Sequence, residues 1–432
     1  MKDLFKIDNS TLPESWESKM IEQLFDFFGG FSASRSQLTN IGSLYLHYGD
    51  IHILKKNYIN VDEDEGWLPR LDKDPSTFKE HVFLQNGDIV FADASEDYDG
   101  IGKSVVIENP SSENFVSGLH TIIARDKSAQ LDIKFKRYCF STNHVRKQFR
   151  ALATGTSVYG ISKSNIGKVV ILIPSIREQE IIADILSTVD QQIENTDQLI
   201  EKTKELKKGI MQKLLTKGIN HNEFKKTEFG EIPNSWDLIP LEYLSEHITY
   251  GFTNPMPETK NGPFMITAKD IINGKINYDT VRKTDIDKFE NELTSKSKPV
   301  INDLLITKDG TLGRLAIVDK EDICINQSVA TLRIKHDLVD VRFIYYLLSS
   351  NKVQQRILFD AGGSTIKHIY ITKLGKMEVP IPQSKEEQLE IVKILSTIDA
   401  KIDLLVANQK KFKLLKKGLM QKLLTGKIRV RV

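Results

Sequence analysis

The sequence contains little that would support a disulfide framework, a thiolate metal site or insertion into a membrane. Cys139 and Cys324 are the only cysteines among 432 residues, which excludes a disulfide framework and a cysteine-based zinc site. We find no apolar run of membrane-spanning length and no signal peptide. The formal net charge of +2 is too small to indicate a polyanionic partner by itself. The composition is that of an ordinary globular protein, and we expect it in the cytoplasm.

Complete enzyme motifs are missing as well. The stretch YDGIGKS at 98–104 ends like a phosphate-binding loop, but Asp97 stands where such a loop needs glycine. The residues SVVIEN that follow are typical of a strand, whereas a phosphate loop leads into a helix. The amino-methyltransferase motif is absent, with residues 254–256 coming nearest, and no His-Glu-x-x-His zinc helix occurs. We therefore predict no catalytic residue, metal or cofactor in this chain.

Two distant stretches share one plan of strand, glycine turn and strand. In residues 86–109 and 301–320, an apolar run is followed by Asp-Gly, a second glycine with a basic neighbour, and another apolar run. Asp-Gly between apolar runs predicts a hairpin whose glycine has positive φ. We therefore expect equivalent hairpins at Asp99-Gly100 and Asp309-Gly310, with Lys103 and Arg314 as cations beside the turns.

The repetition is clearest in two long segments, 175–216 and 384–425, which correspond at a constant offset of 209 residues. Both contain ILST and end in KKG(I/L)MQKLLT. Ser175 with Glu178, and Ser384 with Glu387, fit the capping box that opens a helix. Apolar residues recur at alternating spacings of three and four, which predicts two helices of about 60 Å that pair along a seam.

Polar residues and glycines interrupt this seam and leave two interpretations open. The interruptions are Thr196, Thr203, Lys207, Gln409 and Lys416. Either their long stems reach out to solvent from a tolerant coiled coil, or the rod is open there to a partner. Gly209 and Gly418 occupy the same relative position inside the helices, where glycine is unfavourable. They indicate a kink or a close backbone approach.

The remaining segments predict two similar globules. Each opens with Pro-x-Ser-Trp and has short strands, a helical segment (134–152 or 341–359), a small-residue loop and a final strand. The expected parts are a first domain at 1–174, a first long helix at 175–216, a polar linker at 217–231, a second domain at 232–383, a second long helix at 384–425 and a basic tail at 426–432. From Leu404 to the end, basic residues occur without Asp or Glu, which fits a solvated face or a polyanion contact.

On these doubled elements the chain resembles the specificity subunits of type I restriction–modification enzymes. The motifs are the Pro-x-Ser-Trp openings, the IP…EQ…ILS helix starts and the LKKG(I/L)MQKLLT endings. The resemblance implies an α+β fold with two mixed α/β target recognition domains, separated by two long antiparallel helices in a coiled coil and related by an internal pseudo-two-fold repeat. It implies a bipartite double-stranded DNA target, and docking of two methyltransferase subunits and of restriction (motor) subunits. S-adenosylmethionine, ATP and magnesium would belong to those partners.

DNA contacts need side chains that reach a groove edge or a phosphate, and we predict them in turns and loops. In the second half the candidates are Tyr250, Phe252, Thr253, Thr267, Lys269, Thr307, Lys308, Thr311, Arg314, Gly363, Ser364, Thr365 and Lys367. In the first half they are Ser34, Arg35, Lys103, Ser104, Thr156, Ser157, Tyr159, Ser162 and Lys163.

Two other functions fit the same sequence. The chain could be the recognition subunit of a related enzyme that cuts outside its site. The sequence does not distinguish this function from that of a type I specificity subunit. The chain could also be a coiled-coil scaffold whose globules bind proteins, which would have no affinity for DNA. Salt dependence of DNA binding distinguishes the scaffold from both recognition subunits.

Overall fold

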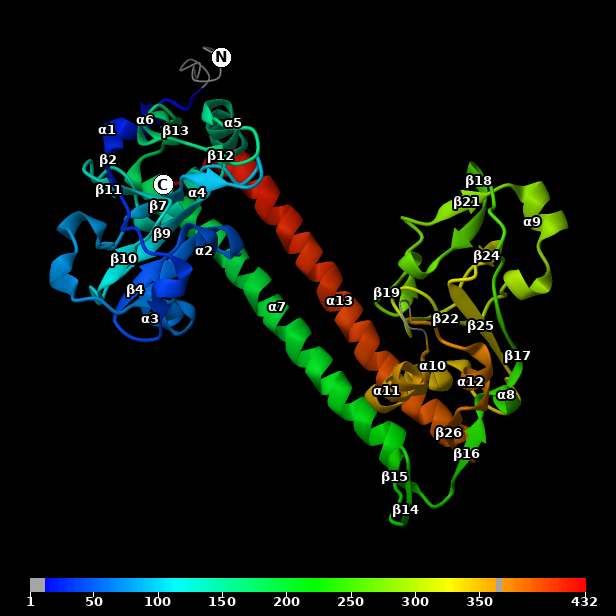
Figure 1. Ribbon diagram of the computed structural model, residues 1–432. Coiled ribbons are helices and arrows are strands. Elements are labelled where there is room, and N and C mark those ends of the chain that lie inside the picture. The colour runs from blue at the N-terminus through cyan, green and yellow to red at the C-terminus, as the bar shows by residue number, and fades with distance from the viewer. Residues whose placement is uncertain (1–11, 363–366) are drawn as a thin grey trace. The chain divides into compact units, whose positions relative to one another are not determined.

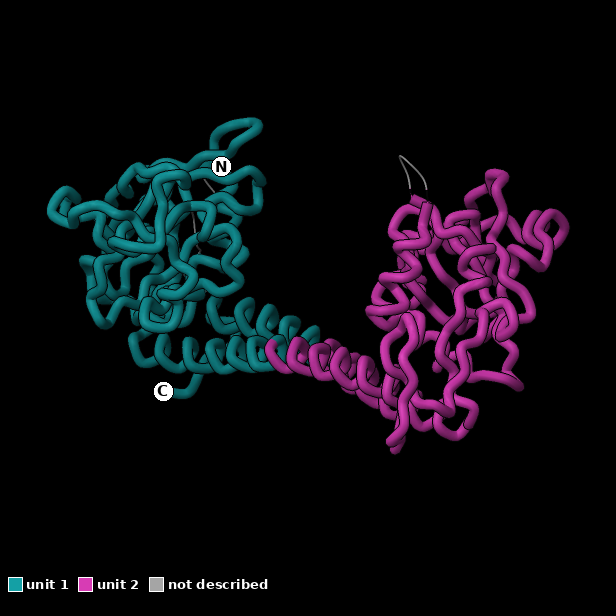
Figure 2. Tube along the Cα trace, turned by 60° about the horizontal axis from the view of Figure 1, so that its bottom comes forward, with its two compact units in different colours: residues 1–197, 408–432 teal, residues 198–407 magenta. Residues whose placement is uncertain are grey.

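The computed structural model describes residues 12–362 and 367–432 (Figure 1). Its contacts divide the chain into two compact units, coloured separately in Figure 2. Unit 1 comprises residues 1–197 and 408–432, and unit 2 comprises residues 198–407. Each unit combines small β-sheets with short helices and with one stretch of each long helix, so the predicted mixed α/β class is confirmed.

Unit 1 is built on two main sheets. The first has the order β2 (Phe25–Gly29), β11 (Thr121–Asp126), β7 (Ile89–Ala92), β9 (Ser104–Glu108) and β5 (Tyr58–Asn60). The second has the order β10 (Phe115–Ser117), β4 (Ser43–Leu46), β6 (Arg70–Leu71) and β3 (Leu38–Thr39). Two further pairs join β1 (Glu17–Met20) to β13 (Val170–Ile173), and β8 (Ala94–Ser95) to β12 (Tyr159–Gly160). Strands β4 and β7 are buried at every position, which agrees with the apolar residues that fill them apart from Ser43.

Unit 2 repeats this plan. Its larger sheet has the order β17 (Ser245–Tyr250), β25 (Val329–Ile334), β22 (Leu304–Thr307) and β23 (Leu315–Ile317). A three-stranded sheet joins β21 (Arg282–Thr284), β18 (Glu258–Ile266) and β24 (Ile323–Ile325). The two-stranded pairs are β16 (Trp236–Pro240) with β26 (Glu378–Pro382), β14 (Phe224–Thr227) with β15 (Gly230–Pro233), and β19 (Ile271–Ile272) with β20 (Lys275–Ile276).

The same contacts recur in both units. Strands β10 and β4 pair in parallel, as do β24 and β18. A buried aspartate before the central strand binds an arginine on the next strand through both of its oxygens. These pairs are Asp88 with Arg125, at 3.1 and 2.7 Å, and Asp303 with Arg333, at 2.9 and 2.7 Å. The duplication predicted from the sequence therefore extends to individual side-chain contacts.

Short helices cover the sheets. Unit 1 has α1 (Ile21–Leu24), α2 (Tyr48–Ile53), α3 (Val61–Asp64), α4 (Ile133–Cys139), α5 (Asn143–Leu152) and α6 (Lys163–Gly167). Unit 2 has α8 (Leu241–Leu244), α9 (Ile286–Glu292), α10 (Val341–Ser349), α11 (Asn351–Asp360) and α12 (Ile371–Lys376). Each predicted helical segment is thus two helices. In unit 1 the break lies at Thr142, whose hydroxyl accepts the Val145 amide hydrogen and starts α5 anew.

The long helices are α7 (Ile176–Lys217) and α13 (Lys385–Leu423). In unit 1, Asp190 contacts Lys416 and Asp197 contacts Gln409. In unit 2, Lys207 contacts Asp399, while Ile219 just beyond α7 contacts Glu387. Residue numbers rise along one helix as they fall along the other, so the two helices run antiparallel within each unit.

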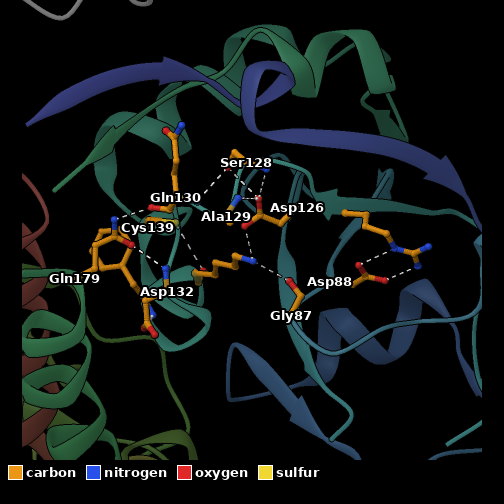
Figure 3. A network of polar contacts seen from close by, with 12 residues as sticks. Gly87, Asp88, Asp126, Ser128, Ala129, Gln130, Asp132, Cys139 and Gln179 are labelled. Atoms are coloured by element: carbon orange, nitrogen blue, oxygen red, sulfur yellow. Dashed lines mark hydrogen bonds and ion pairs between the residues drawn. The ribbon is translucent and has the colours of Figure 1, made fainter. Parts of the chain in front are cut away.

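The ends of the long helices belong to the cores of the units. In unit 1 the residues Ile182, Leu186 and Leu423 pack in one cluster with Trp16, and in unit 2 Leu395 packs with Trp236. Gln179 fixes the start of α7 by donating to Gln130 O and Pro174 O and accepting from the Asp132 amide, all at 2.9 Å (Figure 3).

The first turns of both long helices differ from the predicted capping boxes. The Ser175 and Ser384 hydroxyls accept the Glu178 and Glu387 amide hydrogens, as expected. The glutamates do not reach back to the serine amides, because stronger donors hold their carboxylates. Arg429 donates to Glu178 at 2.7 Å. His221 and Trp236 contact Glu387 at 2.8 and 3.2 Å.

The seam interruptions have partners within the chain. Lys207 and Lys416 form ion pairs with aspartates of the facing helix, Gln409 donates to Asp197, and the Thr203 hydroxyl donates to Leu199 O. These lysines are mostly buried, so the idea that they extend into solvent is wrong. Of the two alternatives predicted at Gly209 and Gly418, a kink or a close backbone approach, the close approach is wrong, because a Cβ there would meet nothing within 4 Å. Nothing in the structure explains these two glycines.

The segment predicted as a polar linker at 217–231 contains the strand β14 and the beginning of β15, which pair antiparallel. It is therefore an ordered hairpin. Within residues 12–362 and 367–432, no helix is long and apolar enough to cross a membrane.

Candidate nucleic-acid interface

Each unit carries a glycine-rich loop between two neighbouring strands of its larger sheet. Strand β7 pairs antiparallel with β9, and β22 with β23, which confirms both predicted hairpins. Strand β9 occupies the place where a phosphate loop would need a helix. Gly102, Gly310 and Gly313 adopt positive φ of 65°, 78° and 76°. Gly100 does not adopt positive φ. In unit 1 the turn predicted at Asp99-Gly100 therefore lies at the next glycine, Gly102.

The small-residue loop meets this hairpin loop in both units. In unit 1, the Ile161 amide donates to Asp93 O at 2.8 Å, and the Tyr98 and Tyr159 rings meet at 5.2 Å. In unit 2, the Ile369 amide donates to Lys308 O at 2.9 Å, and Asp309 forms a β-bridge with His368. Two loops that are distant in sequence thus form one surface, and the backbone contacts that join them are equivalent in the two units.

A Gly-Phe turn borders the surface in each unit. The Gly30 amide donates to Thr121 O, and the Gly251 amide donates to Val329 O. A Cβ on Gly30 would lie 1.9 Å from Gly118 O, and one on Gly251 would lie 1.8 Å from Ile325 O. Only glycine fits this close approach. It holds the following phenylalanine, Phe31 or Phe252, at the end of its strand.

In unit 2 the surface gathers cations and rings around Asp309. Lys308 Nζ lies 2.8 Å from the Asp309 carboxylate and 5.3 Å from the centre of the exposed Tyr250 ring. His368 Nδ1 lies 2.5 Å from the same carboxylate. Burial alone would raise the pKa of Asp309, but the hydrogen bonds from His368 and Lys308 lower it below its ordinary value. Arg314 is exposed, and its guanidinium donates to Ile271 O.

In unit 1 several predicted cations already have partners. Lys103 Nζ donates to His52 O at 2.7 Å and Leu54 O at 3.1 Å. Burial, with the nearby Arg146, lowers the pKa of Lys103. Lys103 therefore fastens α2 to the hairpin. Arg35 pairs with the buried Asp50 at 3.0 Å while its side chain stays 59% exposed, which leaves most of the guanidinium accessible.

The predicted contact residues divide by exposure. The exposed ones are Ser34, Arg35, Thr156, Ser157, Ser162, Lys163, Tyr250, Thr253, Lys269, Thr311, Arg314 and Lys367. Half-buried ones are Lys103, Ser104, Tyr159, Phe252, Thr267 and Lys308. Thr307 is fully buried, and its hydroxyl is used inside the hairpin, donating to Thr311 O and accepting from the Arg314 amide. Gly363, Ser364 and Thr365 lie outside the described residues.

Sequence reasoning missed other residues on these surfaces. Tyr98 packs on Tyr159, His368 binds Asp309, and His120 lies 3.1 Å from Asp93 in a left-handed backbone conformation with φ of 56°. The repeated dipeptide Gly-Phe at 30–31 and 251–252 was a signal for the bordering turns. Nothing in the sequence pairs His120 with Asp93, because their approach depends on the sheet register.

A lysine-lined cleft lies beside the long helices in each unit. In unit 2 it has a volume of about 340 Å³ and is lined by Lys204, Lys207, Lys208 and Lys352 together with Met211 and Asn351. In unit 1 it has a volume of about 560 Å³, and Lys413, Lys416, Lys417 and Met420 line it with Lys147 and Asn143. The helix residues of the two clefts correspond at the offset of 209. Among described residues, neither lining includes Asp or Glu.

Comparison with known proteins gives one consistent result. Residues 13–205 and 255–414 match the family model for the type I restriction modification DNA specificity domain. A putative type I restriction enzyme specificity subunit, MjaX, from Methanocaldococcus jannaschii is 27% identical over 99% of this chain and 96% of its own. The EcoBI specificity subunit of Escherichia coli is 28% identical over 59% of this chain and 56% of its own.

Solved structures show the same fold. The S subunit of a type I restriction–modification system from M. genitalium matches with a TM-score of 0.55 at 19% identity, covering 97% of this chain and 98% of that one. A chain from a type I system studied for complex assembly and conformational transition matches with a TM-score of 0.58 at 15% identity, covering 97% and 100%.

The resemblance seen in the sequence is thereby confirmed. Two family matches in one chain agree with the repeated contacts of units 1 and 2. Specificity subunits are non-catalytic, because the catalytic activities of these systems belong to other subunits. The chain belongs to the family of type I restriction–modification DNA specificity subunits.

Proposed function

We propose that this chain reads a split DNA sequence, with one half-site recognised by the loop surface of each unit. The observation that carries the proposal is the duplicated surface, in which hairpin loop, small-residue loop and Gly-Phe turn meet through equivalent contacts. Two similar surfaces suit a ligand with two similar sites, and duplex DNA presents a major groove on one face about every 34 Å.

The exposed residues of these surfaces divide by chemistry. Arg35, Lys163, Arg314 and Lys367 have the reach to address base edges or phosphates. Thr156, Ser157 and Thr311 can donate hydroxyl hydrogens to phosphates at closer range. The exposed Tyr250 ring offers an apolar face next to Lys308. We propose this exposed set as the contact region and omit Thr307, because its hydroxyl is engaged within the buried turn.

The long helices act in this proposal as an antiparallel coiled coil that fixes the number of base pairs between half-sites. The support is the antiparallel contact of α7 and α13 within each unit, and the packing of the helix ends into each core. The proposed parts remain a recognition domain before each long helix, with residues 175–216 and 384–425 as spacer.

Partner subunits supply the chemistry. Two methyltransferase subunits, using S-adenosylmethionine, would dock one on each lysine-lined cleft, because the clefts are duplicated and their linings contain several lysines but no Asp or Glu among the described residues. Restriction subunits using ATP and magnesium would complete the assembly. We propose that the complex acts in the cytoplasm, where the DNA is.

Exchange of one half tests the proposal. Residues 1–174 are replaced by the first half of another family member, and the chimera is expressed with its methyltransferase subunits. Sequencing of methylated sites is expected to show a change in one half-site while the other stays as in the parent. A change in both half-sites would contradict independent readers.

The binding of purified chain to DNA gives a second test. Affinity is expected to fall steeply as salt rises, because phosphate contacts release counterions. Absence of DNA binding, both alone and with the methyltransferase subunits, would instead favour a protein-binding scaffold.

A further inference from the structure

One carboxylate in each unit connects three structural elements. In unit 1, Asp190 of α7 accepts a hydrogen bond from the Tyr138 hydroxyl of α4 at 2.9 Å and pairs with Lys416 of α13 at 2.6 Å. In unit 2, Asp399 of α13 accepts from the Tyr346 hydroxyl of α10 at 2.7 Å and pairs with Lys207 of α7 at 2.6 Å.

The two junctions are copies with the helix roles exchanged. Asp399 and Lys416 are the counterparts of Asp190 and Lys207 at the offset of 209 residues. The aspartate comes from α7 in unit 1 and from α13 in unit 2, and the lysine always comes from the facing helix. The tyrosine comes from the globular part both times. Each oxygen of the carboxylate has its own partner, Oδ1 for lysine and Oδ2 for tyrosine.

Burial makes the junctions selective for one geometry. The tyrosines are 2% and 5% exposed, and each lysine also lies over its tyrosine ring, at 5.6 and 5.3 Å. Burial, together with the neighbouring carboxylate, raises the pKa of Tyr138 and Tyr346, so both stay protonated donors. A rotation of α4 or α10 against the long helices would leave a buried hydroxyl without an acceptor, which is unfavourable.

We propose that these Tyr–Asp–Lys junctions are positioning sites that hold each recognition surface at one orientation on the long helices and thereby restrict the spacer length between half-sites. This inference rests on the proposed function. The Tyr–Asp–Lys junctions would determine how strongly one spacer length is preferred over others, whereas the loop surfaces would determine which bases are recognised.

The test uses the full chain expressed with its methyltransferase subunits, and Tyr138→Phe, Tyr346→Phe and the double variant. Phenylalanine keeps the buried ring and removes only the hydroxyl. The measurement is the genome-wide ratio of methylation at sites with the native spacer to sites one base pair longer or shorter. We expect each single variant to lower this ratio about tenfold, the factor for losing one hydrogen bond to a charged group, and the double variant to lower it further, because it loses one such bond in each unit.

The matched control is Asp184→Asn. Asp184 also links α7 to α4, through Lys134 at 3.1 Å, but the pair is exposed. We expect it to keep the wild-type ratio, because exposed pairs contribute little. The base sequences of the half-sites should stay unchanged in every variant.

Each other outcome overturns an identifiable claim. A folded double variant with the wild-type ratio overturns the positioning role. Loss of all methylation, or failure of a single Tyr→Phe variant to fold, also overturns the positioning role, because the hydroxyl would then be needed for the stability of the unit in general. If the wild-type chain methylates no split sequence at all, the proposed function itself fails.

Discussion

Replacing Gly251 by alanine addresses the turn that borders the unit 2 surface. A Cβ there would lie 1.8 Å from Ile325 O and 2.2 Å from its carbonyl carbon, both backbone atoms, whereas real Cβ contacts stay above about 3.0 Å. The end of β17 must therefore move away from β24. The hydrogen bond from Phe252 N to Ile325 O, at 3.1 Å, and that from Gln327 N to Phe252 O, at 2.8 Å, would be weakened or lost.

The loss of two hydrogen bonds and the disturbed packing should together lower the free energy of unfolding by about 3 kcal/mol. For a unit of this size the melting temperature should fall by about 6–12 °C. Differential scanning calorimetry of the full chain measures it, and DNA binding through the unit 2 surface should weaken in parallel. Gly209→Ala is the matched control in the same unit, because its Cβ would meet nothing within 4 Å. It should stabilise the helix by about 0.5–1 kcal/mol.

The reasoning would be refuted if Gly251→Ala melted within about 2 °C of the wild-type chain, since about 3 kcal/mol demands a larger shift. It would also be refuted if Gly209→Ala lowered the melting temperature as much as Gly251→Ala, because glycine would then be required for a reason other than close approach.

Three further changes test the structural account. Asp303→Asn should destabilise unit 2 by about 3 kcal/mol in denaturant titration, because it breaks the nearly buried pair with Arg333, whereas Glu292→Gln in an exposed pair should change stability by less than about 0.5 kcal/mol. Burial alone would raise the pKa of Glu178, but Arg429 lowers it below its ordinary value. The stability that Glu178 contributes is therefore complete above that ordinary pKa and is lost as the pH falls below it. Glu178→Gln should remove this part of the acid sensitivity, and an unchanged dependence of stability on pH would contradict the prediction. Lys103→Ala should lower the free energy of unfolding by about 1–2 kcal/mol, because two carbonyls lose their donor. A phosphate-release assay should detect no ATPase activity that depends on Lys103.

The sequence predicted those features that follow from periodicity and local turn chemistry. The long helices, the two hairpins and the duplication depend on apolar spacing, serine caps and glycine turns, which are local signals. The offset of 209 residues also identified which residues correspond, and Asp190 and Asp399 do make equivalent contacts.

Features that depend on tertiary contacts were not predictable in this way. Lys103 was expected on the surface, but the carbonyls of His52 and Leu54 that hold it, at the end of α2, lie about 50 residues away in sequence. Glu178 has the right spacing for a capping box, but Arg429 takes its carboxylate instead. The interrupted seam suggested exposed or partner-binding lysines. The pairing of α7 with α13 explains the aspartate that faces each lysine, and the packing of α4 and α10 explains the tyrosine.

The most direct measurement of the central claim is a genome-wide map of methylated sites in cells that express this chain with its methyltransferase subunits. The account predicts one split sequence, with two specific half-sites separated by a fixed number of unspecified base pairs. A continuous recognition sequence, or half-sites methylated at many different separations, would contradict it.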